Sequence, residues 1–86
     1  MKILAQPIDA VAVFAREKPP MPYKFKYVHG DEKCEIRVDK VLHIENRRIA
    51  GIPAIVYSCQ SVVDGLEKRY ELKYLPSSCR WELYKM

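Results

Sequence analysis

Turn-forming residues recur along this chain at intervals too short for long helices. Gly30, Gly51, Gly65 and six prolines divide it into segments of about ten residues, the spacing expected when short strands alternate with turns. Several of these segments alternate apolar and polar side chains, which is typical of a strand with one buried face. The sequence therefore predicts an all-β fold, in which residues 1–86 form a single small domain.

Composition supports a globular and intracellular protein. Hydrophobic residues make up 49% of the chain and charged residues 30%, which is enough for one small core. No apolar run reaches the ~18 residues of a membrane span, and Pro7 and Asp9 interrupt the segment that a secretory leader would need. Three cysteines are an odd set for a disulfide scaffold. We therefore expect a cytoplasmic protein with reduced thiols.

Two turn dipeptides, Gly30-Asp31 and Asp64-Gly65, predict β-hairpins of definite register, because both favour two-residue turns. In both hairpins apolar residues then face apolar partners, in the pairs Tyr23–Val38, Phe25–Ile36, Tyr27–Cys34, Ile55–Tyr74, Tyr57–Leu72 and Cys59–Tyr70. A slip of one residue would place charged side chains among them. These residues are therefore predicted to form the inner face of a sheet.

Two further turns extend this sheet. Pro76-Ser77 predicts a hairpin that sets Leu72 opposite Trp81, and a turn within Glu45–Arg48 connects the third strand to the fourth. The segment Ala10–Ala15 is apolar on both faces, so the first strand is expected to cover the inner face or to close the sheet. The predicted architecture is a six-strand antiparallel meander curled into a small SH3-like or related barrel.

Basic residues alternate with the apolar ones and are therefore predicted to face outward. The candidate binding residues are Lys24, Arg37, Lys73 and Arg80 in one row across the sheet, with Lys33 and Arg69 on its flank. Like charges placed opposite one another destabilise a sheet, and a bound phosphate backbone would relieve that repulsion. The alternative is a merely solvated face, on which Lys73 pairs with Glu82 and Arg80 with Glu71.

The aromatic side chains do not form a stacking platform in this arrangement. All the tyrosines on the strands except Tyr84 fall on the predicted inner face, together with Phe25 and Trp81. Single-strand binders expose such rings to the bases. A ligand of this surface would therefore be held through its phosphate backbone.

The sequence contains no recognisable catalytic or metal-binding constellation. Cys34 and Cys59 fall side by side in the predicted register, but neither belongs to a Cys-x-x-Cys motif, and His29 and His43 lack metal-ligand spacing with them. Buried free thiols are expected, with a disulfide or thiol switch between the two cysteines as the alternative. Phosphate-loop and hydrolase motifs are absent, so neither an enzyme nor a cofactor is predicted.

Several core and turn elements occur in a recognisable order. They are Tyr23–Tyr27 leading into Gly30, the strand Ile36–Leu42, Tyr57, Asp64-Gly65 before Tyr70–Leu72, and Trp81–Tyr84. From Pro19 onward the chain resembles small bacterial β proteins of unknown function, some encoded beside or fused to Y-family translesion DNA polymerases. The resemblance implies a cytoplasmic accessory module linked to DNA metabolism, and it supplies no catalytic residue.

These observations predict a non-enzymatic binding module. Its expected ligand is nucleic acid, bound weakly and with little sequence preference through the outer basic row, and the net charge of +4 permits such a partner. The alternative is a protein–protein interaction or accessory-subunit module that uses the Lys18–Pro22 loop and the adjacent edge strand. Neither a membrane nor a small-molecule cofactor is expected as a partner.

Overall fold

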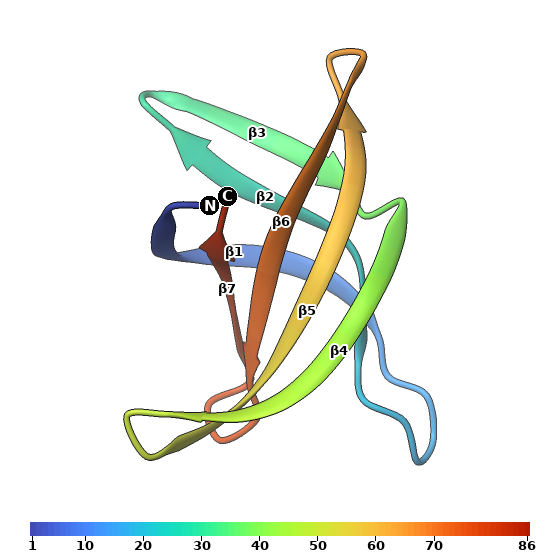
Figure 1. The fold of residues 1–86 in the computed structure, drawn as a ribbon, viewed down its shortest axis with the longest axis vertical. Coiled ribbons are helices and arrows are strands. Elements are labelled where there is room, and N and C mark those ends of the chain that lie inside the picture. The colour runs from blue at the N-terminus through green and yellow to red at the C-terminus, as the bar shows by residue number, and fades with distance from the viewer.

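Seven strands and the turns between them make up the protein (Figure 1). The computed structural model describes residues 1–86 and contains no helix, so no helix could cross a membrane. The strands are β1 (Ile3–Val13), β2 (Met21–His29), β3 (Glu32–Arg37), β4 (Lys40–Ile49), β5 (Ile52–Val63), β6 (Leu66–Leu75) and β7 (Arg80–Lys85). The all-β prediction is confirmed. The strands number seven rather than six because the predicted strand Ile36–Leu42 breaks after Arg37.

All seven strands belong to one antiparallel sheet, in the order β3-β2-β1-β7-β6-β5-β4. The first strand, β1, is an interior strand that pairs with both β2 and β7, so it extends the sheet instead of covering its inner face. Ala10 and Ala12 pack against the core, whereas Val11 and Val13 are exposed, so the expectation that both faces of Ala10–Ala15 are covered is wrong. β3 and β4 remain as free edges, so the sheet is not closed into the predicted barrel.

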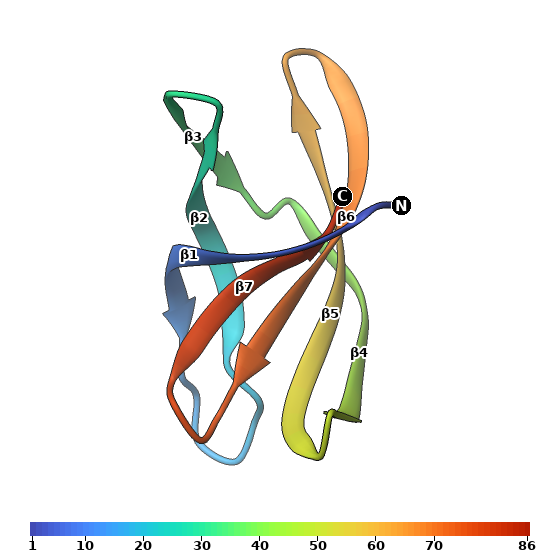
Figure 2. The same cartoon turned by 90° about the vertical axis from the view of Figure 1, so that its left-hand side faces the viewer.

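The sheet folds back on itself to enclose a core. Figure 2 shows β2 and β3 in one layer and β4, β5 and β6 in the other, with β1 and β7 running between them. The two layers meet through side chains, since the rings of Phe25 and Tyr70 lie 5.5 Å apart. Register shifts in β1, near Ala5, and in β7, at Tyr84, interrupt regular pairing, and such bulges increase local bending.

The predicted inner face supplies this core. Its nine buried members are Phe25, Ile36, Tyr57, Cys59, Tyr70, Leu72, Tyr74, Trp81 and Leu83, and all were placed on that face by strand alternation. Tyr57 and Leu72 are fully buried and directly opposite each other, as predicted. Strand alternation in the sequence therefore assigned the side chains at the centre of the sheet to the correct face.

The hairpins at Gly30-Asp31 and Asp64-Gly65 have the predicted registers. The hairpin after Leu75 differs, because its turn is longer and Trp81 lies opposite Tyr74 rather than Leu72. Ser78 N donates to the Leu75 carbonyl in this turn. The shift is by two residues, so the same side chains still face inward.

The predicted turn within Glu45–Arg48 is wrong. The chain turns instead at Ala50-Gly51, where φ is 51° and 79°, so β4 continues to Ile49. Two successive positive φ angles define a type I′ turn, and alanine is an unusual residue at its first position. The sequence therefore contains only a weak indication that the chain turns at Ala50-Gly51.

The β1–β2 connection closes one end of the folded sheet. The Tyr57 hydroxyl donates a hydrogen bond to the Pro20 carbonyl, and Pro20 and Pro22 are both buried. The strand that follows this loop, β2, lies between β1 and β3. The prediction of an edge strand beside the Lys18–Pro22 loop is therefore wrong.

Candidate nucleic-acid interface

A β-bulge near the start of β2 changes which side chains face outward. Val11 of β1 pairs with Lys24, but the next residue, Ala12, pairs with Pro22, so Tyr23 is the extra residue. Pro22 is consequently buried and Tyr23 is 44% exposed. The prediction that Tyr23 faces inward is wrong, because a bulge reverses the alternation beyond it. Pro22 is the sequence signal, since proline within a strand often marks a bulge.

The bulge brings Tyr23 against a basic residue of the neighbouring strand. The guanidinium carbon of Arg37 lies 5.3 Å from the centre of the Tyr23 ring, within range of a cation–π contact. Val38 N donates to the Tyr23 carbonyl at 2.9 Å, which ties the end of β3 to the bulge. Lys24 lies directly opposite Arg37, as predicted. One aromatic and two basic side chains therefore lie together.

Two more lysines extend this surface along β2 and β3. Lys26 alternates with Lys24 on β2, and Lys33 lies opposite Val28 on the same face. We call the set Lys24, Lys26, Lys33 and Arg37 the basic face. Lys26 was not among the predicted site residues, although its spacing from Lys24 places both on one side of the strand.

Two carboxylates partly neutralise the basic face. Lys24 Nζ lies 3.3 Å from Glu35 Oε1, with both side chains nearly half exposed, and Asp9 of β1 lies opposite Lys26. Exposed ion pairs of this kind are weak. Four positive charges set against these two negative ones leave an excess of two, so the surface remains attractive to an anion.

Shallow hollows run over the same surface and extend it towards β7. Two hollows of about 260 and 220 Å³ share Asp9 and Lys26 in their linings. A third, of about 430 Å³, is lined by Asp9 together with Arg80. Arg80 therefore lies across β1 from the basic face and adjoins it.

Lys73 and Arg69 do not join this surface. Both are on β6, which is separated from β2 by β1 and β7. Lys73 is only 7% exposed, with its Nζ 3.0 Å from Glu82 Oε1 and 4.7 Å from the centre of the Tyr84 ring. Arg69 lies opposite Gln60 in the β5–β6 hairpin. The prediction of one continuous basic row is therefore wrong, because the strands assumed to be neighbours are not.

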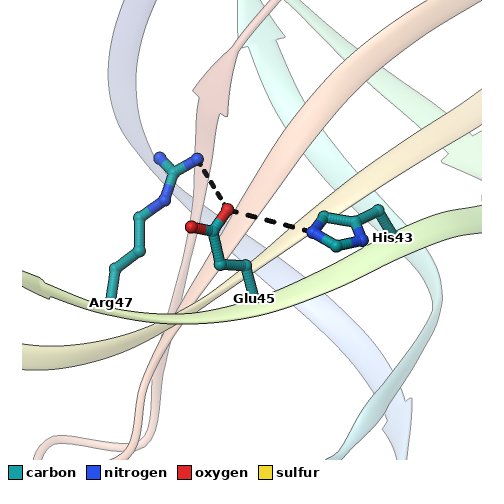
Figure 3. A network of polar contacts seen from close by, with 3 residues as sticks. All are labelled: His43, Glu45 and Arg47. Carbon is teal, nitrogen blue, oxygen red and sulfur yellow. Dashed lines mark hydrogen bonds and ion pairs between the residues drawn. The ribbon is translucent and has the colours of Figure 1, made fainter.

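A second polar network lies on edge strand β4, where the sequence predicted a turn. Arg47 Nη2 donates to Glu45 Oε2 at 3.0 Å, and His43 Nε2 lies 4.0 Å from the same oxygen (Figure 3). The hydrogen bond from Arg47, followed by its charge, lowers the pKa of the Glu45 carboxyl. The network is solvent-exposed and has the character of a surface ion pair rather than of a catalytic group.

The three cysteines are separate and free. Cys34 lies opposite Tyr27, whereas Cys59 is flanked by Val41 and Tyr70, so the predicted adjacency of the two thiols is wrong. Burial raises the pKa of the Cys59 thiol to about 12, so it is protonated at neutral pH. No three His, Cys, Asp or Glu side chains are arranged to hold a metal ion.

Comparison of the chain with known protein families, with curated proteins and with solved structures found no match. The fold and the surface themselves describe the kind of protein this is. It is a small antiparallel β-sheet protein, folded on itself with two free edges, whose outer surface is basic on one layer.

Proposed function

We propose that the protein is a non-enzymatic binding module whose basic face holds nucleic acid through its phosphate backbone. Binding is weak and has little sequence preference, because lysine and arginine side chains on a sheet contact phosphates rather than base edges. The observation that carries this proposal is the direct cross-strand pair of Lys24 and Arg37 beside the outward-turned Tyr23.

The cross-strand pair is costly without a ligand. Two cations directly opposite each other repel, and Glu35 compensates only Lys24, through a half-exposed contact. A phosphate placed between Lys24 and Arg37 would be attracted to both and would release counterions from the nucleic acid. The pair is therefore better suited to binding an anion than to stabilising the sheet.

Tyr23 adds an aromatic surface to this electrostatic one. A base can stack on an exposed ring, and such stacking tolerates any sequence. Because Arg37 already lies over the ring, a single strand would meet a cation and an aromatic side chain at one point. This favours single-stranded nucleic acid as the ligand.

A salt titration tests the proposal. Fluorescence anisotropy of a labelled single-stranded oligonucleotide is expected to show affinity that falls steeply with salt, with a log–log slope of about −0.7 per phosphate contacted. Arg37→Ala is expected to reduce this slope by roughly one contact. Arg69→Ala removes the same charge from the β5–β6 hairpin and serves as the control, with no expected change in slope. Absence of binding at ~50 mM salt would end the proposal, since electrostatic binding is strongest there.

We further propose a cytoplasmic location, with a role in DNA metabolism. The three free cysteines support the first, since reduced thiols are normal in that compartment. The resemblance to β proteins associated with Y-family polymerases supports the second. The ligand would then be DNA, or a protein that acts on DNA.

A protein-interaction module is the second candidate, favoured by apolar side chains around the β1–β2 connection. Val13, Phe14 and Met21 are all exposed there, with Phe14 at 65%. Although β2 is not an edge strand, this connection could still contact a partner or serve in subunit association. Light scattering distinguishes the candidates, because association through this connection is expected to be lost in Phe14→Ser while oligonucleotide binding is retained.

A further inference from the structure

The free edge of β4 is long and regular. β4 has ten residues and contains neither proline nor glycine, and it pairs without interruption with β5 from His43 to Ile49. Its one bulge is at Leu42, near the start of the strand. An open edge of this kind presents unpaired backbone groups to any other strand. Figure 1 shows β4 at the border of the sheet.

The turn at Ala50-Gly51 determines which backbone groups of β4 are free. In a two-residue type I′ turn the flanking residues, here Ile49 and Ile52, form a hydrogen-bonded pair. Hydrogen-bonded positions alternate along an antiparallel strand, so every second residue of β4 points its N–H and C=O away from β5. Those residues are Ile44, Asn46 and Arg48.

We propose that two copies of this chain associate through β4, antiparallel, with Asn46 opposite Asn46 of the partner subunit. In this register the outward N–H and C=O groups of Ile44, Asn46 and Arg48 form hydrogen bonds with the same groups of the partner subunit. Glu45 of each copy then lies opposite the partner's Arg47 on the outer face. Such non-hydrogen-bonded positions bring Cα atoms to about 4.5 Å, where opposite charges stabilise the pairing.

The neighbouring registers are unfavourable. Centring the junction on Glu45 places Glu45 against the partner's Glu45 and His43 against the partner's Arg47. Centring it on Arg47 places two arginines together. Centring it on Ile44 requires Leu42, at the bulge, to pair with the partner's Asn46. Charge and strand regularity therefore select the register centred on Asn46.

The side chains needed for this junction are already aligned. Glu45 and Arg47 project from the same face of β4 and are joined at 3.0 Å within one copy (Figure 3). Association exchanges the two internal pairs, one in each copy, for two equivalent pairs between the copies. The other edge, β3, is less suitable, because it has six residues and carries Lys33 and Arg37 of the basic face, which would be brought near their own copies.

Sedimentation equilibrium of the full chain tests this inference. We expect a concentration-dependent dimer, and Glu45→Arg is expected to raise its dissociation constant about tenfold or more, because both cross-junction pairs become repulsive. Glu45→Arg combined with Arg47→Glu restores opposite charges and should restore dimerisation. Asn46→Pro removes an outward N–H and should abolish it, with circular dichroism reporting whether the sheet remains intact.

Two controls locate the junction. Glu35→Arg makes the same charge change on edge β3, and Phe14→Ser alters the β1–β2 connection, so neither should change the dissociation constant. A monomer at all concentrations up to about 1 mM would overturn the inference. So would a dimer that persists in Glu45→Arg, or failure of the charge exchange to restore it. None of these outcomes depends on nucleic-acid binding.

Discussion

Replacing Ser61 with alanine removes a hydrogen-bonded link between the two layers of the folded sheet. Ser61 is buried on β5, and its Oγ donates to the Arg37 carbonyl at 2.7 Å. The same oxygen lies 2.5 Å from the Tyr70 hydroxyl. Because the serine hydroxyl has a single proton, which it gives to Arg37, Tyr70 is the donor in the second bond. Ser61 therefore connects the end of β3 with β5 and β6.

The expected cost of Ser61→Ala follows from these two bonds. The Tyr70 hydroxyl, buried with its ring, loses its acceptor, which costs about 1–3 kcal/mol, and loss of the bond to Arg37 adds about 1 kcal/mol. A total of about 2 to 4 kcal/mol lowers the melting temperature by roughly 10 °C or more in a domain of this size. Tyr70→Phe alone should cost only about 1 kcal/mol, since Ser61 keeps its bond to Arg37.

Urea unfolding of the two single variants and the double variant measures this coupling. Ser61→Ala with Tyr70→Phe should be less destabilising than the sum of the single changes by about 1 kcal/mol, because the double variant leaves no unpaired hydroxyl. A cost below about 0.5 kcal/mol for Ser61→Ala, or strictly additive effects, would refute the role given to Ser61.

Three further predictions concern the core, the turns and pH. Leu72→Ala, at a fully buried position, should lower the free energy of unfolding by about 2–5 kcal/mol in urea denaturation, and a loss under 1 kcal/mol would contradict its place in the core. Ala50→Gly should stabilise the protein by up to about 1 kcal/mol, because alanine there is held at φ 51°; destabilisation would argue against the type I′ turn. Burial raises the pKa of the Cys59 thiol from its ordinary value of 9.0 to about 12 in the folded state, so the folded state retains the proton longer and stability falls as pH rises between these values. In that pH range Cys59→Ala should reduce the loss of unfolding free energy by about 1.4 kcal/mol per pH unit. An unchanged dependence of the unfolding free energy on pH would count against a buried thiol.

Local turn chemistry accounts for what the sequence predicted correctly. Gly30-Asp31 and Asp64-Gly65 each fix a hairpin because few residues tolerate positive φ, and strand alternation then assigns every side chain to a face. The register of Phe25 with Ile36 and of Tyr57 with Leu72 follows directly. Most of the core was therefore predictable from short-range information.

The incorrect predictions arise where geometry depends on distant contacts or on uncommon residues. Ala50 adopts a conformation that its side chain does not favour, so the turn after Ile49 left no clear signal. The position of β1 between β2 and β7 depends on pairing between the chain ends. Because β1 and β7 lie between β2 and β6, Lys24 and Lys73 are far apart in the sheet. The basic row predicted to cross neighbouring strands is therefore not continuous.

The candidate site was predictable in part. The Lys24 and Arg37 pair followed from the hairpin register and is present in the structure. The contribution of Tyr23 was not predictable from alternation, because a single bulged residue reverses the face of the strand. A proline within an otherwise regular strand is the feature that could have indicated it.

Chemical-shift mapping during titration with a single-stranded oligonucleotide tests the proposed binding surface most directly. Amide shifts are expected along Tyr23–Tyr27 and Lys33–Arg37, with weaker changes around Asp9, and they should diminish as salt is added. Shifts centred on the β5–β6 hairpin, or none in low salt, would contradict the assignment of nucleic-acid binding to the basic face.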